Sequence, residues 1–139
     1  MMQDEFDECL VLNTRMAARA VTRRYDVKLR PYGVTAAQFT VLISVARRPD
    51  RSVTEIAGSI AMERSTLSRN LDLLERKGLI YGHGAERGNG RLCAMTEAGS
   101  ALVEVLVPQW RAMQAELRTQ LAQPDLQSMV TALQQLAKL

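Results

Sequence analysis

The stretch SVTEIAGSIAMERSTLSRNLDLLERKGLI, residues Ser52–Ile80, contains two short amphipathic segments separated by about one turn. In the first segment, Ser52 and Glu55 have the Ser-x-x-Glu spacing of a helix capping box. Apolar residues follow at helical spacing: Val53, Ile56, Ala57 and Ile60. This pattern predicts a short helix that begins after Ser52 and buries one face.

The second segment has a leucine stripe and an opposite face that is polar. Leu67, Leu71 and Leu74 recur at helical spacing, and Gly78 follows basic residues at the expected helix end. The face opposite the leucines carries Ser65, Arg69, Asp72 and Arg76, with Ser68 on its flank and Arg64 and Thr66 at the helix start. A helix that presents both side-chain types can read bases and bind phosphates in a DNA major groove. The order predicts a helix-turn-helix motif, with two ordinary core helices as the alternative.

The residues that follow, LIYGHGAERGNGRLCAM (79–95), contain four glycines between two short apolar segments. The apolar segments at 79–81 and 92–95 predict a β-hairpin, and Asn89-Gly90 is a strong two-residue turn signal. A hairpin with arginines directly after a recognition helix is typical of a wing that reaches the minor groove or nearby phosphates. We therefore expect wing contacts from Arg87, Asn89 and Arg91, with a plain surface turn as the alternative.

Helical patterns flank this central region on both sides. A single long helix is predicted over 7–30, ended by the sequence RPYG, and a short apolar helix over 35–46. From Thr96 onward the pattern is helical again up to the C-terminus. The apolar stripes of these terminal helices exceed what one chain of 139 residues readily covers, which favours a homodimer. The alternative is that they pack on each other within one subunit.

Composition and charge limit the class of protein. The chain is 47% hydrophobic but only 4% aromatic, which favours one domain of aliphatic helices. It has no long apolar run and begins with acidic residues, so we expect neither a membrane span nor a signal peptide, and a cytoplasmic location. The net charge of +3 arises entirely between positions 47 and 91, a segment that contains nine Arg and Lys residues and six Asp and Glu residues. A local basic excess indicates a polyanionic partner such as double-stranded DNA.

Catalytic and metal sites have little support. The single histidine, His83, has no neighbouring carboxylate or second metal ligand in the sequence, so we expect it on the surface. The two cysteines, Cys9 and Cys93, are too isolated for a zinc site or a disulfide framework. The sequence therefore predicts no enzyme activity, no cofactor and no metal. A helical adaptor protein is a further alternative, which salt-dependent DNA binding would exclude.

Three segments together resemble the multiple-antibiotic-resistance regulator (MarR) family: YGVTAAQFTVL (32–42), the opening stretch, and MTEAGSALVE (95–104). The resemblance implies a winged helix-turn-helix lobe over 34–100 and dimerisation helices over 4–31 and 101–139. It assigns DNA contacts to Ser65, Thr66, Ser68 and Arg69 and to a wing arginine. The sequence departs from the family where an Asp-x-Arg pattern is usual, because these positions read Arg87-Gly88-Asn89. Glu86 with Arg87, or Arg91 shifted by two positions, is the expected replacement.

The function that the resemblance implies is a repressor that binds a palindromic operator as a homodimer and is released by a small-molecule effector. Small aromatic or phenolic compounds are the effector class we expect. The alternative is an oxidation-sensing repressor of the same fold that acts through Cys9. Several acidic residues precede Cys9, and nearby negative charge disfavours the reactive thiolate. We therefore expect Cys9 to be mainly a packing residue.

Overall fold

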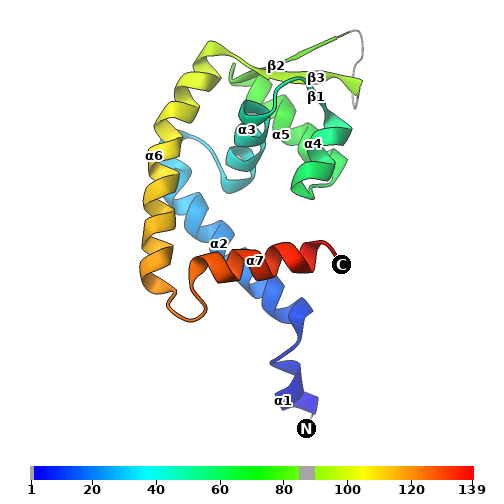
Figure 1. Cartoon of the computed structure of the whole chain (residues 1–139). Coiled ribbons are helices and arrows are strands. Elements are labelled where there is room, and N and C mark those ends of the chain that lie inside the picture. Colours follow the sequence, from blue (N-terminus) through cyan, green and yellow to red (C-terminus); the bar gives the residue numbers. More distant parts are fainter. Residues whose placement is uncertain (1, 85–89) are drawn as a thin grey trace. The chain divides into compact units, whose positions relative to one another are not determined.

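The computed structural model of the chain describes residues 2–84 and 90–139 (Figure 1). Its helical elements are α1 (Met2–Phe6), α2 (Leu10–Leu29), the short 3-10 helix η1 (Arg30–Tyr32), α3 (Ala36–Arg47), α4 (Val53–Ile60), α5 (Arg64–Arg76), α6 (Glu97–Gln120) and α7 (Leu126–Ala137). Its strands are β1 (Arg51–Ser52), β2 (Ile80–His83) and β3 (Leu92–Met95). The predicted fold class, mainly helical with a small β-wing, is confirmed. The chain divides into two compact units, Met1–Glu104 and Val105–Leu139.

The predicted capping box starts α4. The Ser52 hydroxyl accepts a hydrogen bond from the Glu55 backbone N–H at 3.2 Å, and the Glu55 carboxylate accepts one from the Ser52 backbone N–H at 3.1 Å. The hydrogen bond from the Ser52 backbone lowers the pKa of the Glu55 carboxyl. The helix ends at Ala61, which adopts a left-handed conformation with φ of 51°. This tight end allows α5 to begin only a few residues later, as the helix-turn-helix order requires.

The core of the first unit lies between α3, α4 and α5. The α5 leucines Leu67, Leu71 and Leu74 are fully buried, as their spacing predicts. They meet apolar side chains of α3 and α4 that are also fully buried: Val41, Leu42, Val45, Val53 and Ile56. Because complete burial of an aliphatic side chain contributes about 1.5–3 kcal/mol, this stripe holds α5 firmly and leaves its other face outward.

The N-terminal region is helical but not one continuous helix. The predicted helix over 7–30 is broken at residues 7–9, and α2 begins after Cys9, whose backbone is extended. The Asn13 side chain donates hydrogen bonds of 2.8 Å to the carbonyl groups of Asp7 and Cys9. Such local bonds from an asparagine favour a helix start over continuation of the helix. At the other end, η1 and Gly33, with φ of 77°, stop α2 where the sequence predicts.

The start of α3 is fixed by a capping box within α3 and by a hydrogen bond to α2. Thr35 and Gln38 form the box, and the Asp26 carboxylate on α2 accepts a hydrogen bond from the Ala36 backbone N–H at 2.7 Å. The rings of Tyr25 and Phe39 lie 6.4 Å apart between centroids. The last turns of α2 therefore belong to the packed lobe.

The sheet has the strand order β1–β3–β2, with antiparallel neighbours. Ile80 lies opposite Met95 and His83 opposite Leu92, so the two predicted arms of the hairpin are confirmed. The predicted turn at Asn89-Gly90 includes a residue outside the described part of the chain. The two-residue strand β1, where Arg51 lies opposite Cys93, was not predicted because two residues carry no recognisable alternation.

Arg51 is buried, although it is one of the nine basic residues between positions 47 and 91. Its side chain donates to the Ser44 carbonyl and hydroxyl at 2.8 Å each, to the Ser59 hydroxyl at 3.0 Å and to the Arg48 carbonyl at 3.1 Å. The residue is only 8% exposed. Arg51 therefore ties β1 to α3 and α4, and it is not available to a polyanion.

Candidate nucleic-acid interface

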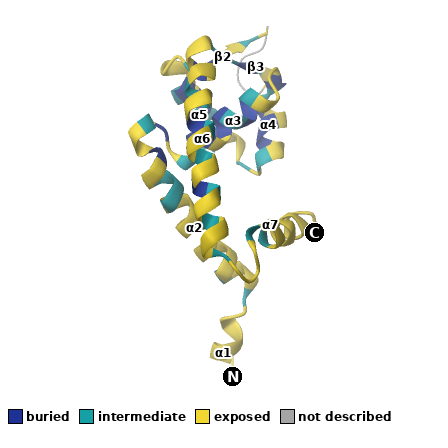
Figure 2. Ribbon diagram, turned by 60° about the vertical axis from the view of Figure 1, so that its left-hand side comes forward, coloured by how far each residue is buried: buried dark blue, intermediate teal, exposed yellow. Residues whose placement is uncertain are grey.

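The exposed face of α5 carries the residues predicted to recognise DNA. Arg64, Ser65 and Arg69 are exposed, whereas Thr66 and Ser68 are half-buried at the flanks. Figure 2 shows that the buried segments gather in the region of α3, α4 and α5. The structure thus brings all five predicted α5 residues to one end of one helix. Their side chains provide donors for phosphates and base edges without a change in the core.

Local contacts hold this helix and its side chains in place. The Arg69 guanidinium donates to the Thr66 hydroxyl at 3.4 Å, and the Asn70 side chain donates to the Thr66 carbonyl at 3.0 Å. At the far end, the Lys77 ammonium donates to the Gly33 carbonyl at 2.6 Å, which links the end of α5 to the turn before α3. The Lys77 ammonium therefore makes a bond within the lobe, although Lys77 is one of the nine basic residues between positions 47 and 91.

The wing residues are placed unequally. Arg87 and Asn89 lie outside the described residues, as does Glu86. Arg91 is described, and its side chain turns back onto α5, where it donates to Asp72 at 2.9 Å and to Glu75 at 3.3 Å. Its side chain is 17% exposed. The structure therefore places Arg91 beside two carboxylates instead of on an exposed wing tip, because charge-assisted hydrogen bonds draw the guanidinium to them.

His83 has a carboxylate partner that sequence reasoning missed. Its Nε2 lies 2.5 Å from the Asp50 Oδ1, and its ring centroid lies 5.8 Å from that of Tyr81. The sequence offers His83 no nearby carboxylate, and the structure supplies one from a distant position, while 38% of the His83 side chain stays exposed. Asp50 is 33 positions upstream and adopts φ of 63° just before β1. The pair links the wing to the loop after α3, and no local pattern in the sequence could have indicated it.

The two cysteines occupy different environments. Cys93 lies in the central strand β3 and is 1% exposed, and burial raises the pKa of its thiol. A buried, protonated thiol is a poor nucleophile, so Cys93 is a packing residue. Cys9 is half-buried and precedes α2 as its N-terminal capping residue, with no side-chain hydrogen bond to the helix.

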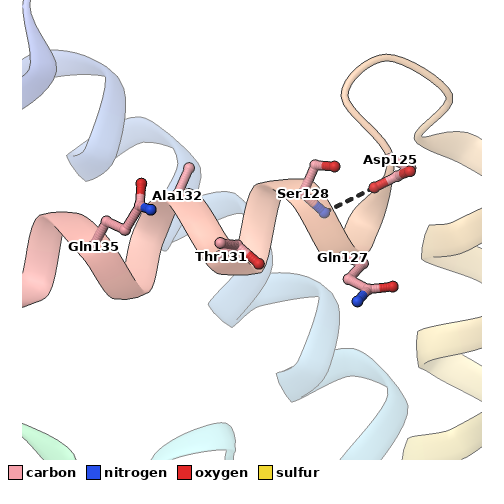
Figure 3. A pocket seen from close by; sticks show the side chains of 6 residues that line it. All are labelled: Asp125, Gln127, Ser128, Thr131, Ala132 and Gln135. Carbon is pink, nitrogen blue, oxygen red and sulfur yellow. Dashed lines mark hydrogen bonds between the residues drawn. The ribbon is translucent and has the colours of Figure 1, made fainter.

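A shallow depression on the second unit is lined by α7 alone (Figure 3). Its residues are Asp125, Gln127, Ser128, Thr131, Ala132 and Gln135. Asp125 caps the helix by accepting a hydrogen bond from the Ser128 backbone N–H at 2.7 Å, which lowers the pKa of its carboxyl. Because one side of one exposed helix forms the whole surface, it does not enclose a ligand.

The fold and this interface define a class of protein. A capped helix, a tight turn, a second helix with an outward polar face and a β-hairpin together form a winged helix-turn-helix lobe, which places its second helix against DNA. In the part of the chain that the structure describes, no helix has the length and apolar character to cross a membrane.

Comparisons with known proteins identify the family. A family model described as MarR family matches residues 32–91. The Mycobacterium tuberculosis transcriptional regulator MosR is 34% identical, with a TM-score of 0.81 over 96% of this chain and 98% of that chain. The structure of MosR in complex with DNA is 33% identical, with a TM-score of 0.81 over 94% of each chain. The chain therefore belongs to the MarR family, and the protein is a DNA-binding transcriptional regulator and not an enzyme.

A third similar structure is that of BpsR from Bordetella bronchiseptica, whose DNA binding is regulated by 6-hydroxynicotinic acid. It is 22% identical, with a TM-score of 0.81 over 94% of this chain and 96% of that chain. At this level of identity the comparison supports the shared fold.

Proposed function

We propose that the protein is a repressor that binds a two-fold symmetric DNA operator as a homodimer. The observation that carries this proposal is the outward face of α5, where Ser65 and Arg69 are exposed opposite fully buried leucines and Arg64 is exposed at the helix start. Thr66 and Ser68 supply hydroxyls at its flanks. The DNA complex of MosR supports a DNA-binding role for the same fold. The wing residues Arg87 and Asn89 are proposed contacts to the adjacent backbone or minor groove.

Exposed apolar residues on the helices that flank the lobe support the homodimer. In the single chain, α2 exposes large apolar residues along its length: Leu10, Val11, Met16, Val21 and Val27. On the second unit, α7 exposes Val130, Leu133 and Leu136. Exposed apolar surface of this extent is typical of a partner interface. The proposed partner is a second copy of the chain.

A footprinting experiment tests the proposal. We expect the protein to protect an inverted repeat whose half-sites are about 10 base pairs apart, one helical turn, because two related lobes must reach the same side of the duplex. Sedimentation with a short duplex of this sequence should give two chains per duplex. Deletion of residues 125–139 should impair this assembly before it disturbs the lobe. Protection of a single asymmetric half-site by one chain would contradict the proposal.

We further propose that a small aromatic or phenolic molecule, and not oxidation of Cys9, releases the protein from DNA. The regulation of BpsR by 6-hydroxynicotinic acid supports a small-molecule effector for this fold. Cys9 is half-buried, and the second cysteine, Cys93, is buried within the sheet. The partial burial of Cys9 and the burial of Cys93 both limit the access of an oxidant, which disfavours redox sensing.

Treatment of the purified protein with mild peroxide separates the two mechanisms. We expect operator binding in a mobility-shift assay to be unchanged by peroxide, in the wild type and in Cys9→Ser alike. A panel of small aromatic acids should instead contain compounds that release the complex. Loss of binding that a reducing agent restores, and that Cys9→Ser prevents, would show that Cys9 is the sensor.

A further inference from the structure

Two carboxylates on α5 hold both strands of the wing. Glu75 Oε1 accepts a hydrogen bond from the Gly82 backbone N–H of β2 at 2.9 Å. Glu75 Oε2 accepts from Arg91, the residue before β3, at 3.3 Å, and Asp72 Oδ1 accepts from the same guanidinium at 2.9 Å. We call this set of four residues, Asp72, Glu75, Gly82 and Arg91, the α5–wing clamp. It joins the DNA-facing helix directly to β2 and, through Arg91, to the start of β3.

The clamp leaves little room at Gly82. A Cβ on Gly82 would lie 3.3 Å from Arg91 Cδ and 3.5 Å from Glu75 Oε1. The glycine therefore allows the arginine side chain to cross β2 and reach α5. Arg91 is well covered there, with 17% of its side chain exposed, whereas the side chains of Asp72 and Glu75 are 58% and 41% exposed. Separation of the partly covered guanidinium from its carboxylate partners therefore costs more free energy than separation of a fully solvated ion pair would.

The charges of the clamp argue against a direct role for Arg91 on DNA. One guanidinium lies between two carboxylates, so the cluster has a net charge of about −1 at neutral pH. A cluster of this sign repels phosphates. This repulsion lowers DNA affinity, and the engagement of both carboxylates with the wing is the role that offsets it.

We propose that Asp72 and Glu75 are positioning residues for DNA binding: they hold the wing at a fixed place relative to α5, so that helix and wing bind the duplex together. Arg91 acts through these carboxylates and makes no contact with DNA itself. This inference rests on the proposed binding of DNA by α5 and the wing. It assigns to the recognition helix a second role, that of supporting the hairpin, through side chains that do not read bases.

The test asks whether removal of one carboxylate charge from the clamp weakens or strengthens operator binding. The substitutions Glu75→Gln and Asp72→Asn each remove one negative charge and keep the shape of the side chain. The amide oxygen introduced by Glu75→Gln can still accept the Gly82 N–H, so this variant isolates the bond to Arg91. We expect each variant to weaken operator binding by about ten-fold, the loss typical of one good contact. The slope of log affinity against log salt should also become shallower, because phosphate contacts of the wing are lost.

Glu63→Gln is the matched control. Glu63 is exposed at the opposite end of α5, precedes the helix and makes no side-chain capping bond. Removal of its charge should leave DNA binding unchanged or strengthen it, because one repulsion is lost. If Glu75→Gln and Asp72→Asn leave binding unchanged or also strengthen it, the inference is wrong, because the two carboxylates then affect DNA binding only through their charge.

A double variant completes the test. Arg91→Gln combined with Asp72→Asn should weaken binding no more than Arg91→Gln alone, because both changes break the same clamp. Losses that add would contradict the inference. Thermal melting of each variant checks that the lobe is folded at the assay temperature. A wild-type protein that binds no DNA would overturn the proposed function itself, whereas wild-type binding with tighter-binding variants overturns only the clamp.

Discussion

Gly99→Ala is expected to unfold the protein at a much lower temperature than the wild type. Gly99 is buried in the first turn of α6, and a Cβ there would lie 1.9 Å from the Leu79 carbonyl oxygen and 2.9 Å from its carbon. Both are backbone atoms, so no side chain can move aside. Thr96 fixes the same junction, because its backbone N–H donates to the Leu79 carbonyl at 3.1 Å and its hydroxyl donates to the Gly78 carbonyl at 2.6 Å.

The expected loss in free energy of unfolding is about 3 kcal/mol or more, at the upper end for an overpacked site. Urea denaturation measures it. Gly58→Ala is the control, since Gly58 is exposed inside α4 and an added Cβ there meets nothing within 4 Å. It should stabilise the protein by about 0.5–1 kcal/mol, the usual gain from alanine in a helix. Wild-type stability in Gly99→Ala would mean that α6 can move away from Leu79 at little cost.

Arg69→Ala should abolish the preference for the operator over scrambled DNA. Arg69 is exposed on the face of α5 opposite the buried leucines, and its hydrogen bond to Thr66 holds the guanidinium over the first turns of the helix. A guanidinium in this position can donate two bonds to a guanine edge, and loss of such a pair costs about 1–3 kcal/mol of discrimination. Competition binding against scrambled duplex gives the ratio of the two affinities.

Arg76→Ala is the control for charge. Arg76 is the last residue of the same helix and is exposed, so its removal should lower affinity for all duplexes similarly and leave the ratio unchanged. An unchanged ratio in Arg69→Ala would show that Arg69 does not read bases.

Features that depend on neighbours along the chain could be predicted. The capping box at Ser52 joins residues three positions apart, and the leucine stripe of α5 repeats within a helical turn. The two arms of the hairpin also follow from short apolar segments around a glycine-rich turn. For these elements local geometry limits the choices, because a cap or an amphipathic face stabilises the same structure in most tertiary settings.

The candidate interface was predictable in part for the same reason. The exposure of Ser65 and Arg69 follows from burial of the leucines on the opposite face, which the spacing alone indicates, and Arg64 is exposed at the start of the helix. Arg51 and Arg91 could not be distinguished in this way. Both are arginines in the basic region of the chain, but their partners decide whether they face solvent, and some of these partners lie on other elements.

The sequence by itself determined the helix pair α4 and α5, the hairpin arms, which face of α5 is buried and which residues it displays, but not the break between α1 and α2. Only the tertiary structure decided which partners the charged side chains around that helix contact. Arg91 meets Glu75 and Asp72 across 16 and 19 positions, and His83 meets Asp50 across 33. Hydrogen bonds and ion pairs are short-range and directional, so these pairs exist only once the strands have packed against the helices. A pattern along the chain records hydrophobic periodicity, but it does not record which distant carboxylate an arginine will reach.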